Sequence, residues 1–264
     1  MVRLIHLTDL HFGFHRDELV APLLARIADA RPDLVVVTGD LTHRALGGQM
    51  AQARAFLDRI AAPLLLVPGN HDLPVWNPLA RIFWPFSGWR RHFGPDLTPV
   101  ARVGEVRVLG INSADPYVWQ RGKIRKGEVG RVLGGLDPLG TNVVALHHPL
   151  QHLSRVDKLL ARRARQALSR LEGGGVHLVL SGHLHRTAAA ELLVTGRHPR
   201  VLQIQSGTAL CARVTDMHNE MAVIDLDGSR LTLTRHLAPM GTPDFTGLDR
   251  QQFSRADGIW RAVP

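Results

Sequence analysis

Short apolar runs alternate with amphipathic stretches along the first quarter of the chain. Val2–Thr8, Leu34–Thr38 and Leu64–Val67 are apolar runs of the length typical of buried strands. Between them, Asp17–Ala30 and Met50–Ile60 carry apolar residues at helical spacing. The order strand, helix, strand, helix, strand requires crossover connections, so the pattern predicts a parallel sheet.

The second half continues with further predicted strands. They are Val106–Ile111, Val143–Leu146, Val176–Leu180, Ala188–Thr195, Val201–Gln205, Met221–Leu226 and Leu231–His236. An Arg-rich helix is predicted over Ser154–Leu171, ended by the glycines at 173–175. Asp227-Gly228 indicates a hairpin turn. Because the pattern weakens from Gly241, we expect a domain over residues 1–240 and a C-terminal tail over 241–264.

Polar residues follow directly at the ends of five predicted strands. The clusters are Asp9-Leu10-His11, Gly39-Asp40, Gly69-Asn70-His71-Asp72, His147-His148 and Gly182-His183-Leu184-His185. Open α/β sheets bind ligands beyond the carboxyl ends of their strands. In extended chain, residues two apart point the same way, so Asp9 and His11 are expected to converge on one point. Each cluster alone is common by chance, but five of them, rich in oxygen and imidazole donors, favour a site for ions such as Mn, Fe or Zn.

The five clusters, in this order, resemble the signature of the calcineurin-like metallophosphoesterase superfamily, which is D-x-H, G-D, G-N-H-[DE], H and G-H-x-H. The segments Leu7–His11, Gly39–Thr42 and His147–Pro149 are similar to the bacterial branch that includes class III cyclic-nucleotide phosphodiesterases. The resemblance implies an α/β fold, a four-layer sandwich of two mixed sheets face to face with helices outside. It also implies a dinuclear metal site at the C-terminal edge of the strands.

The resemblance assigns a role to each cluster. One ion would be held by Asp9, His11, Asp40 and His185, and a second ion by Asp40, Asn70, His147 and His183. The ions would be two divalent metals, Mn, Fe or Zn, with a hydroxide between them that attacks phosphorus. His71 would stand over the phosphate and give a proton to the leaving oxygen, with Asp72 as its orienter. Asn70 and His148 would lie near the substrate.

One position departs from a branch of the superfamily. The residue three after Asp40 is His43, where purple acid phosphatases have a tyrosine that ligates iron. The resemblance therefore disfavours that branch. His43 is expected either to add polarity near the site or to be a simple loop residue.

Charge and composition limit the classes of partner and cellular compartment that we expect for this chain. The chain has a formal net charge of +9, almost entirely from scattered arginines. A positive field attracts an anionic substrate, but no separate DNA-binding segment is visible, so no stable nucleic-acid complex is expected. The single cysteine, Cys211, excludes an intramolecular disulfide and a multi-cysteine zinc site. No apolar run reaches the ~20 residues of a membrane span, and no signal-peptide pattern is present, so we expect a cytoplasmic protein.

Aromatic residues gather just after the Gly69–Asp72 cluster. Residues 74–95 contain Trp76, Phe83, Trp84, Phe86, Trp89 and Phe93, interleaved with arginines. We interpret this segment as a helical insertion that packs on the core or forms a homodimer contact. The alternatives are a cap over an apolar or planar substrate group, or a membrane contact.

Together these features predict a metal-dependent phosphoesterase acting on a small anionic phosphoester. The leading substrate is a nucleotide-like phosphodiester such as a 3′,5′-cyclic nucleotide. Two other reactions stay open: pyrophosphate cleavage in a nucleotide–lipid precursor, which the aromatic segment would suit, and a nuclease, which the charge would suit. A metal-binding scaffold without turnover is a different class, and the complete ligand set with His71 argues against it.

Overall fold

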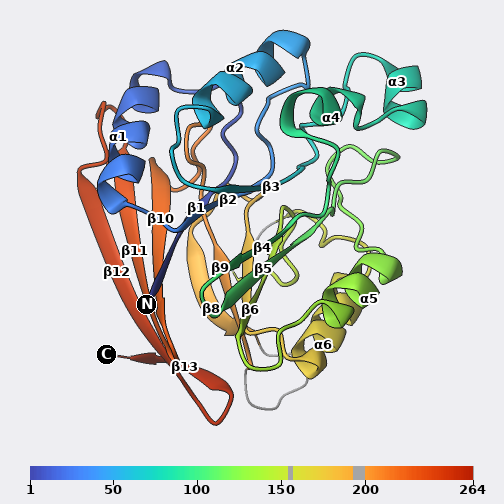
Figure 1. The fold of residues 1–264 in the computed structure, drawn as a ribbon. Helices are drawn as coiled ribbons and strands as arrows, with labels where there is room; N and C mark the ends of the chain where they lie inside the picture. Colours follow the sequence, from blue (N-terminus) through green and yellow to red (C-terminus); the bar gives the residue numbers. More distant parts are fainter. Residues whose placement is uncertain (154–156, 193–199, 264) are drawn as a thin grey trace.

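Two β-sheets lie face to face between two layers of helices in the computed structural model (Figure 1). The structure describes residues 1–153, 157–192 and 200–263. Parts of two predicted elements, 154–156 and 193–195, therefore lie outside the described residues. The predicted four-layer α/β sandwich of two mixed sheets is confirmed.

The first sheet has seven strands in the order β13-β12-β11-β10-β1-β2-β3. Its strands are β1 (Val2–Leu7), β2 (Leu34–Thr38), β3 (Leu64–Val67), β10 (His218–Asp227), β11 (Arg230–Pro239), β12 (Gly247–Ala256) and β13 (Ile259–Val263). β1, β2 and β3 pair in parallel, as predicted, because a helix connects each strand to the next. The remaining strands form an antiparallel meander that joins β1 through β10.

The second sheet has six strands in the order β4-β5-β6-β7-β9-β8. They are β4 (Val100–Val103), β5 (Val106–Ile111), β6 (Thr141–Leu146), β7 (Leu178–Ser181), β8 (Ala188–Leu192) and β9 (Val201–Gln205). The four central strands β5, β6, β7 and β9 run parallel, with an antiparallel strand at each edge.

Helices cover the outer face of each sheet (Figure 1). The 3-10 turn η1 (Asp17–Leu19) with α1 (Val20–Ala30), α2 (Gly47–Leu57) and α4 (Ser87–Phe93) packs on the first sheet, and α5 (Lys126–Gly134) with α6 (Ala164–Gly174) packs on the second. A third apolar cluster fills the space between the sheets, where Leu4 and Val36 meet Val143 and Leu180. The short α3 (Pro78–Phe83) lies at a corner of the molecule, away from these clusters.

Two predicted boundaries are wrong. The helix predicted from Ser154 begins only at Ala164, because Arg163 adopts a left-handed conformation (φ 65°) that a right-handed helix does not tolerate. It runs three residues past the predicted Leu171 and ends at Gly174, with Gly175 as a left-handed cap.

The expected tail after Gly241 is the second error. β12 and β13 in that segment extend the first sheet, and Trp260 packs between the two sheets. The Trp260 indole N–H donates to the carbonyl of His177, 2.8 Å away. Most side chains of β12 are exposed or half-buried, so the apolar alternation that marks a strand in the sequence is faint there.

Candidate metal centre

The carboxyl ends of strands from both sheets meet at one edge of the sandwich. The backbone N–H of His183, after β7, donates to Asp9 Oδ2, after β1, at 3.0 Å. The ring of His147, after β6, donates from Nδ1 to the carbonyl of Thr38, at the end of β2, at 2.8 Å. These bonds tie the two sheets together at the predicted edge.

The backbone at this edge turns sharply at residues other than glycine. Positive φ angles occur at Asp9 (55°), His11 (51°), Asp40 (52°), His183 (71°) and His185 (53°). Such conformations are uncommon and costly for residues with a side chain, and they cluster at functional sites. The extended geometry expected for Asp9 and His11 is therefore wrong. Their side chains still converge, with Asp9 Oδ1 3.5 Å from His11 Nε2, because left-handed turns bring them together.

The first group of donor atoms surrounds Asp9 Oδ1. His185 Nε2 lies 3.0 Å from this oxygen and 3.2 Å from His11 Nε2. Asp40 Oδ2 lies 3.6 Å from His11 Nε2. These are the four side chains expected to hold one ion.

The second group shares Asp40 with the first. Asp40 Oδ2 lies 3.2 Å from His147 Nε2, and Asn70 Oδ1 lies 3.2 Å from the same nitrogen. The His183 ring packs edge-on against the His147 ring, with centroids 5.1 Å apart. Asp40 thus stands between the two groups, in the place expected of a bridging ligand.

Hydrogen bonds behind the donors fix their orientation. Nδ1 of His147 and Nδ1 of His185 each meet a backbone carbonyl, that of Thr38 and that of Arg213. This leaves both Nε2 atoms turned inward, an arrangement typical of metal-binding histidines. Thr8 Oγ1 donates to Asp9 Oδ2 at 2.7 Å, while Oδ1 has no hydrogen-bond partner among the described residues.

The donor set fits divalent cations. Asp9, His11, Asp40 and His147 are almost fully buried, and a buried carboxylate is costly unless a positive charge lies near it. Burial raises the pKa of both carboxyls, but neighbouring imidazoles, His185 beside Asp9 and His147 beside Asp40, hold it well below its usual range. Cations at these two groups would satisfy the carboxylates and the unpartnered Asp9 Oδ1.

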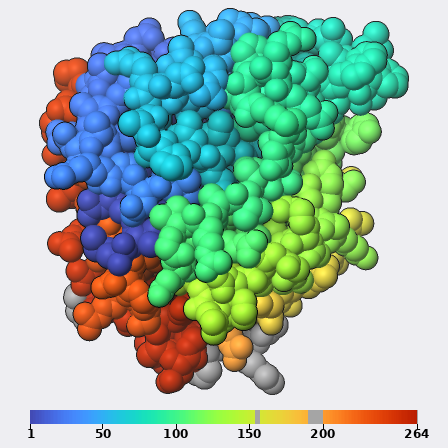
Figure 2. Space-filling model, in the orientation of Figure 1, coloured from blue at the N-terminus to red at the C-terminus, as the bar shows by residue number. Residues whose placement is uncertain are grey.

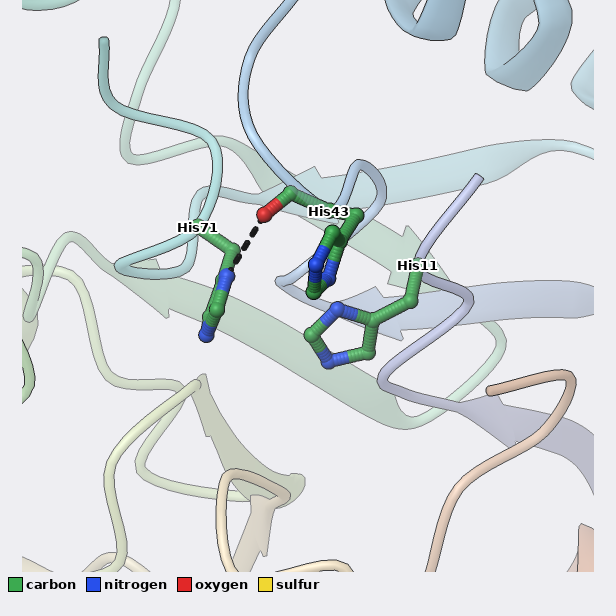
Figure 3. A group of neighbouring side chains, drawn as sticks. All are labelled: His11, His43 and His71. Carbon is green, nitrogen blue, oxygen red and sulfur yellow. Dashed lines mark hydrogen bonds between the residues drawn. The ribbon is translucent and has the colours of Figure 1, made fainter. Parts of the chain in front are cut away.

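His71 borders the site and is not among the donors of either group, although ligand atoms of His11, His43 and His71 lie within 4.8 Å of one another. Its Nδ1 donates to the carbonyl of His43 at 2.7 Å (Figure 3). Its backbone N–H donates to Asp40 Oδ1 at 2.8 Å. The ring stacks against that of His43, with centroids 5.5 Å apart and planes 18° apart. The proton on Nδ1 is thereby engaged, and Nε2 stays available for a substrate.

Asp72 does not make the expected contact with the His71 ring. Its carboxylate accepts from the backbone N–H groups of Leu41, Thr42 and Gly69, at 3.3, 2.9 and 2.9 Å. The orienting contact comes instead from the His43 carbonyl. Asp72 therefore joins the two loops that carry Asp40 and Asn70.

His148 lies against the second donor group, with its ring centroid 4.4 Å from that of His183, but both of its ring nitrogens have other partners. Its Nδ1 lies 2.9 Å from Ser113 Oγ, and its Nε2 lies 2.8 Å from the carbonyl of Gln120. With both ring nitrogens engaged and the side chain buried, His148 positions the 113–120 loop. Of the adjacent pair, His147 is the one whose Nε2 lies beside the Asp40 carboxylate.

Sequence reasoning missed several neighbours of the site. The ligand atoms of His11, His185 and Cys211 lie within 4.8 Å of one another, although a lone cysteine carried no signal. A pocket of about 290 Å³ opens beside the centre and is lined by His43, Arg44, Asn70, His71, Trp119 and Arg213. Arg44 and Arg213 come from loops far apart in the sequence, so only the fold reveals that they share this pocket.

A four-layer sandwich with two adjoining Asp/His donor groups at its strand ends defines a metal-binding α/β protein. Residues 2–187 match the family model described as calcineurin-like phosphoesterase, and the chain belongs to this family. It is 29% identical over 209 residues to a cAMP/cGMP dual specificity phosphodiesterase of Mycobacterium tuberculosis, covering 71% of this chain and 63% of that protein. It is 26% identical over 199 residues to a probable cyclic nucleotide phosphodiesterase of Synechococcus, covering 68% and 72%. The match thus spans less than two thirds of the first relative's length.

Solved structures show the same fold. A purple acid phosphatase from yellow lupin aligns with a TM-score of 0.68 at 14% identity, over 97% of this chain and 54% of that one. Vps29 of Chaetomium thermophilum aligns with a TM-score of 0.51 at 14% identity, over 100% and 98%. At such identity the likeness concerns architecture alone. Among the described residues, no helix is long and apolar enough to cross a bilayer.

Proposed function

We propose that this chain hydrolyses phosphodiester bonds of a small nucleotide-like substrate, such as a 3′,5′-cyclic nucleotide, with two divalent ions. The observation that carries the proposal is the pair of donor groups that share Asp40, beside a pocket into which His71 presents a free nitrogen. Ions held there would neutralise the phosphate charge and act as Lewis acids.

The side chains around the pocket suit an anionic diester. Arg44 and Arg213 line it and bring positive charge to the pocket. Asp40, between the two donor groups, would offset the repulsion between two cations held there. His71, held through Nδ1, gives a proton from Nε2 to the leaving oxygen, a step worth about 10²–10⁴-fold.

The substrate class is supported by the size of the pocket and by the relatives. A pocket of about 290 Å³ is near the lower limit for small-molecule sites. Trp119 lines it with an exposed ring on which a planar group can stack. The names of the similar bacterial proteins point to cyclic nucleotides.

A second candidate is pyrophosphate cleavage in a nucleotide–lipid precursor. It is favoured by one observation: Trp76, Phe83 and Trp84 are exposed on the segment that follows the His71 loop.

A substrate panel on metal-defined protein tests the proposal. The purified chain is stripped with a chelator, analysed for metals, and reloaded with Mn, Fe or Zn. It is then given a monoester, a generic diester, cyclic nucleotides, a nucleotide-linked pyrophosphate and single-stranded DNA. We expect two ions per chain and preferential turnover of cyclic nucleotides. Metal-loaded protein that is inert on the whole panel would overturn the proposal in favour of a scaffold.

Replacement of His71 tests its proposed role separately. His71→Ala should keep both ions, because the ring belongs to neither donor group, and should lose about 10²–10⁴-fold in kcat. Elemental analysis and kcat are measured on the same preparation. Asp40→Ala serves as the contrast and should lose metal and turnover together. Equal metal loss in His71→Ala would contradict the assignment.

A further inference from the structure

The aromatic segment after the His71 loop divides into a buried part and an exposed part. Phe86 and Trp89 pack into the core beneath α2, as expected of an insertion. Trp76, Leu79, Ile82, Phe83 and Trp84 instead have between 48% and 67% of their surface exposed. α3, which carries most of them, projects from a corner of the molecule (Figures 1 and 2). The exposed side chains are therefore not needed to anchor the segment.

A second segment adds to this corner. Arg81 of α3 is buried and donates to the carbonyls of Pro116 and Val118, at 2.8 Å each. It thereby fixes the 116–119 loop beside α3, where Tyr117 and Trp119 are 74% and 63% exposed. The guanidinium of Arg81 also lies over the Trp119 ring, 4.9 Å from its centroid. We call the seven exposed residues of the two segments the α3 surface: Trp76, Leu79, Ile82, Phe83, Trp84, Tyr117 and Trp119.

The charge around the α3 surface is mostly positive, although Asp115 acts on Arg81 and Asp96 is exposed just after α4. Neither residues 73–95 nor residues 116–127 contain an aspartate or glutamate. Arg90 and Arg91 are exposed on α4, and Arg44 lies over the Trp76 ring, 5.2 Å from its centroid. Exposed aromatic rings flanked by a majority of arginines suit a partner that is apolar inside and anionic at its surface.

We propose that the α3 surface docks the protein on an anionic lipid bilayer. Indole and phenol rings favour the boundary between headgroups and acyl chains, because each has an apolar body and a polar tip. Leu79, Ile82 and Phe83 supply apolar area below that level, and the arginines meet the anionic headgroups. A second copy of the chain is a poorer occupant, because pairing two α3 surfaces brings like charges together. Docking is peripheral, since the surface consists of a six-residue helix and a loop.

Vesicle flotation of the full metal-loaded chain tests the proposal. One set of vesicles contains phosphatidylcholine alone, and the other contains phosphatidylcholine with phosphatidylglycerol. We expect binding to the anionic vesicles, weaker binding to the neutral ones, and release as salt is raised. Phe83→Ser with Trp84→Ser should lower the partition coefficient about tenfold or more, because two inserted aromatic rings are lost.

A matched variant controls for the loss of exposed apolar area in general. Leu139 and Leu248 are 96% and 65% exposed on other parts of the molecule. Leu139→Ser with Leu248→Ser should bind anionic vesicles as the native chain does. Equal losses in the two double variants, or no binding of the native chain to either vesicle, would overturn the proposal. A third outcome would also overturn it: the native chain is a dimer that does not bind vesicles, and Phe83→Ser with Trp84→Ser makes it a monomer. The α3 surface would then be occupied by a second copy of the chain.

Hydrolysis of a soluble diester separates this proposal from the proposed function. Phe83 and Trp84 do not line the pocket at the metal centre. The docking variant is therefore expected to turn over a soluble substrate at the native rate. Loss of vesicle binding would therefore count against membrane docking alone, and absence of turnover would count against the proposed function alone.

Discussion

Residues at the site that are not metal donors can act by positioning a neighbouring side chain. His43 illustrates this, because its carbonyl accepts the Nδ1 proton of His71 while its ring stacks on the His71 ring. The Nδ1 of His43 itself is buried without a hydrogen-bond partner among the described residues. The side chain therefore serves the site through stacking, and the backbone serves it through hydrogen bonding.

A pair of variants at His43 separates these two contributions. Both His43→Ala and His43→Phe keep the carbonyl, but only phenylalanine keeps an aromatic face against His71. An aromatic contact is worth about 1 kcal/mol, so we expect His43→Ala to lower kcat about fivefold and His43→Phe to restore most of it. Steady-state kinetics, with metal content as the control, measure the effect. Equal losses in the two variants would show that the stack does not position His71.

The candidate metal donors can be predicted from the sequence, but the residues that surround them cannot. Asp9, His11, Asp40 and His185 are recognisable because each follows a strand and belongs to a spaced cluster. The neighbours Cys211, Arg44 and Arg213 have no such spacing, since each reaches the site through loop packing. For the same reason, the actual partners of Asp72 and His148 could not be foreseen.

At the scale of elements, buried strands are the best predicted part of the molecule. β2, β3, β5 and β9 match the predicted ranges at both ends, because every position within a short apolar run is buried or nearly so. β12 was missed, since only one of its side chains is buried. The predicted helix from Ser154 failed because apolar spacing does not reveal a left-handed residue such as Arg163.

The loops that follow the strands are packed too closely to accept a side chain at certain glycines. A Cβ at Gly69 would overlap Oδ1 and the backbone nitrogen of Asp40. Gly69→Ala should therefore displace Asp40, lower metal content and destabilise the fold by about 1–3 kcal/mol. The matched control is Gly130→Ala in α5, where an added Cβ has no neighbour within 4 Å. This substitution should stabilise the helix by about 1 kcal/mol. Chemical unfolding and elemental analysis report both effects, and native metal content in Gly69→Ala would refute this account.

At the scale of the whole molecule, the two sheets are joined by polar bridges as well as by the apolar cluster between them. His6 of β1 is fully buried, with Nε2 2.7 Å from Thr38 Oγ1 and Nδ1 2.9 Å from Ser206 Oγ, just after β9 of the other sheet. Two hydroxyl groups satisfy a neutral imidazole, one by donating and one by accepting. No carboxylate contacts the ring in these bonds, so the bridge depends on the neutral form.

This bridge makes the stability of the sandwich depend on pH. Burial lowers the pKa of His6 from 6.5 to about 4, although Glu220 partly opposes the shift. Between pH 6.5 and 4, His6 is protonated in the unfolded chain but stays neutral in the folded chain. The contribution of His6 to the free energy of unfolding is therefore complete above about pH 6.5 and falls as pH is lowered toward 4. From pH 7 to pH 5 the loss through His6 is about 2 kcal/mol. Urea unfolding of the native chain and of His6→Gln at both pH values checks this. The native chain should have the larger free energy of unfolding at pH 7, and this difference from the variant should shrink by about 2 kcal/mol at pH 5. A difference that does not change with pH would show that His6 is not the titrating group.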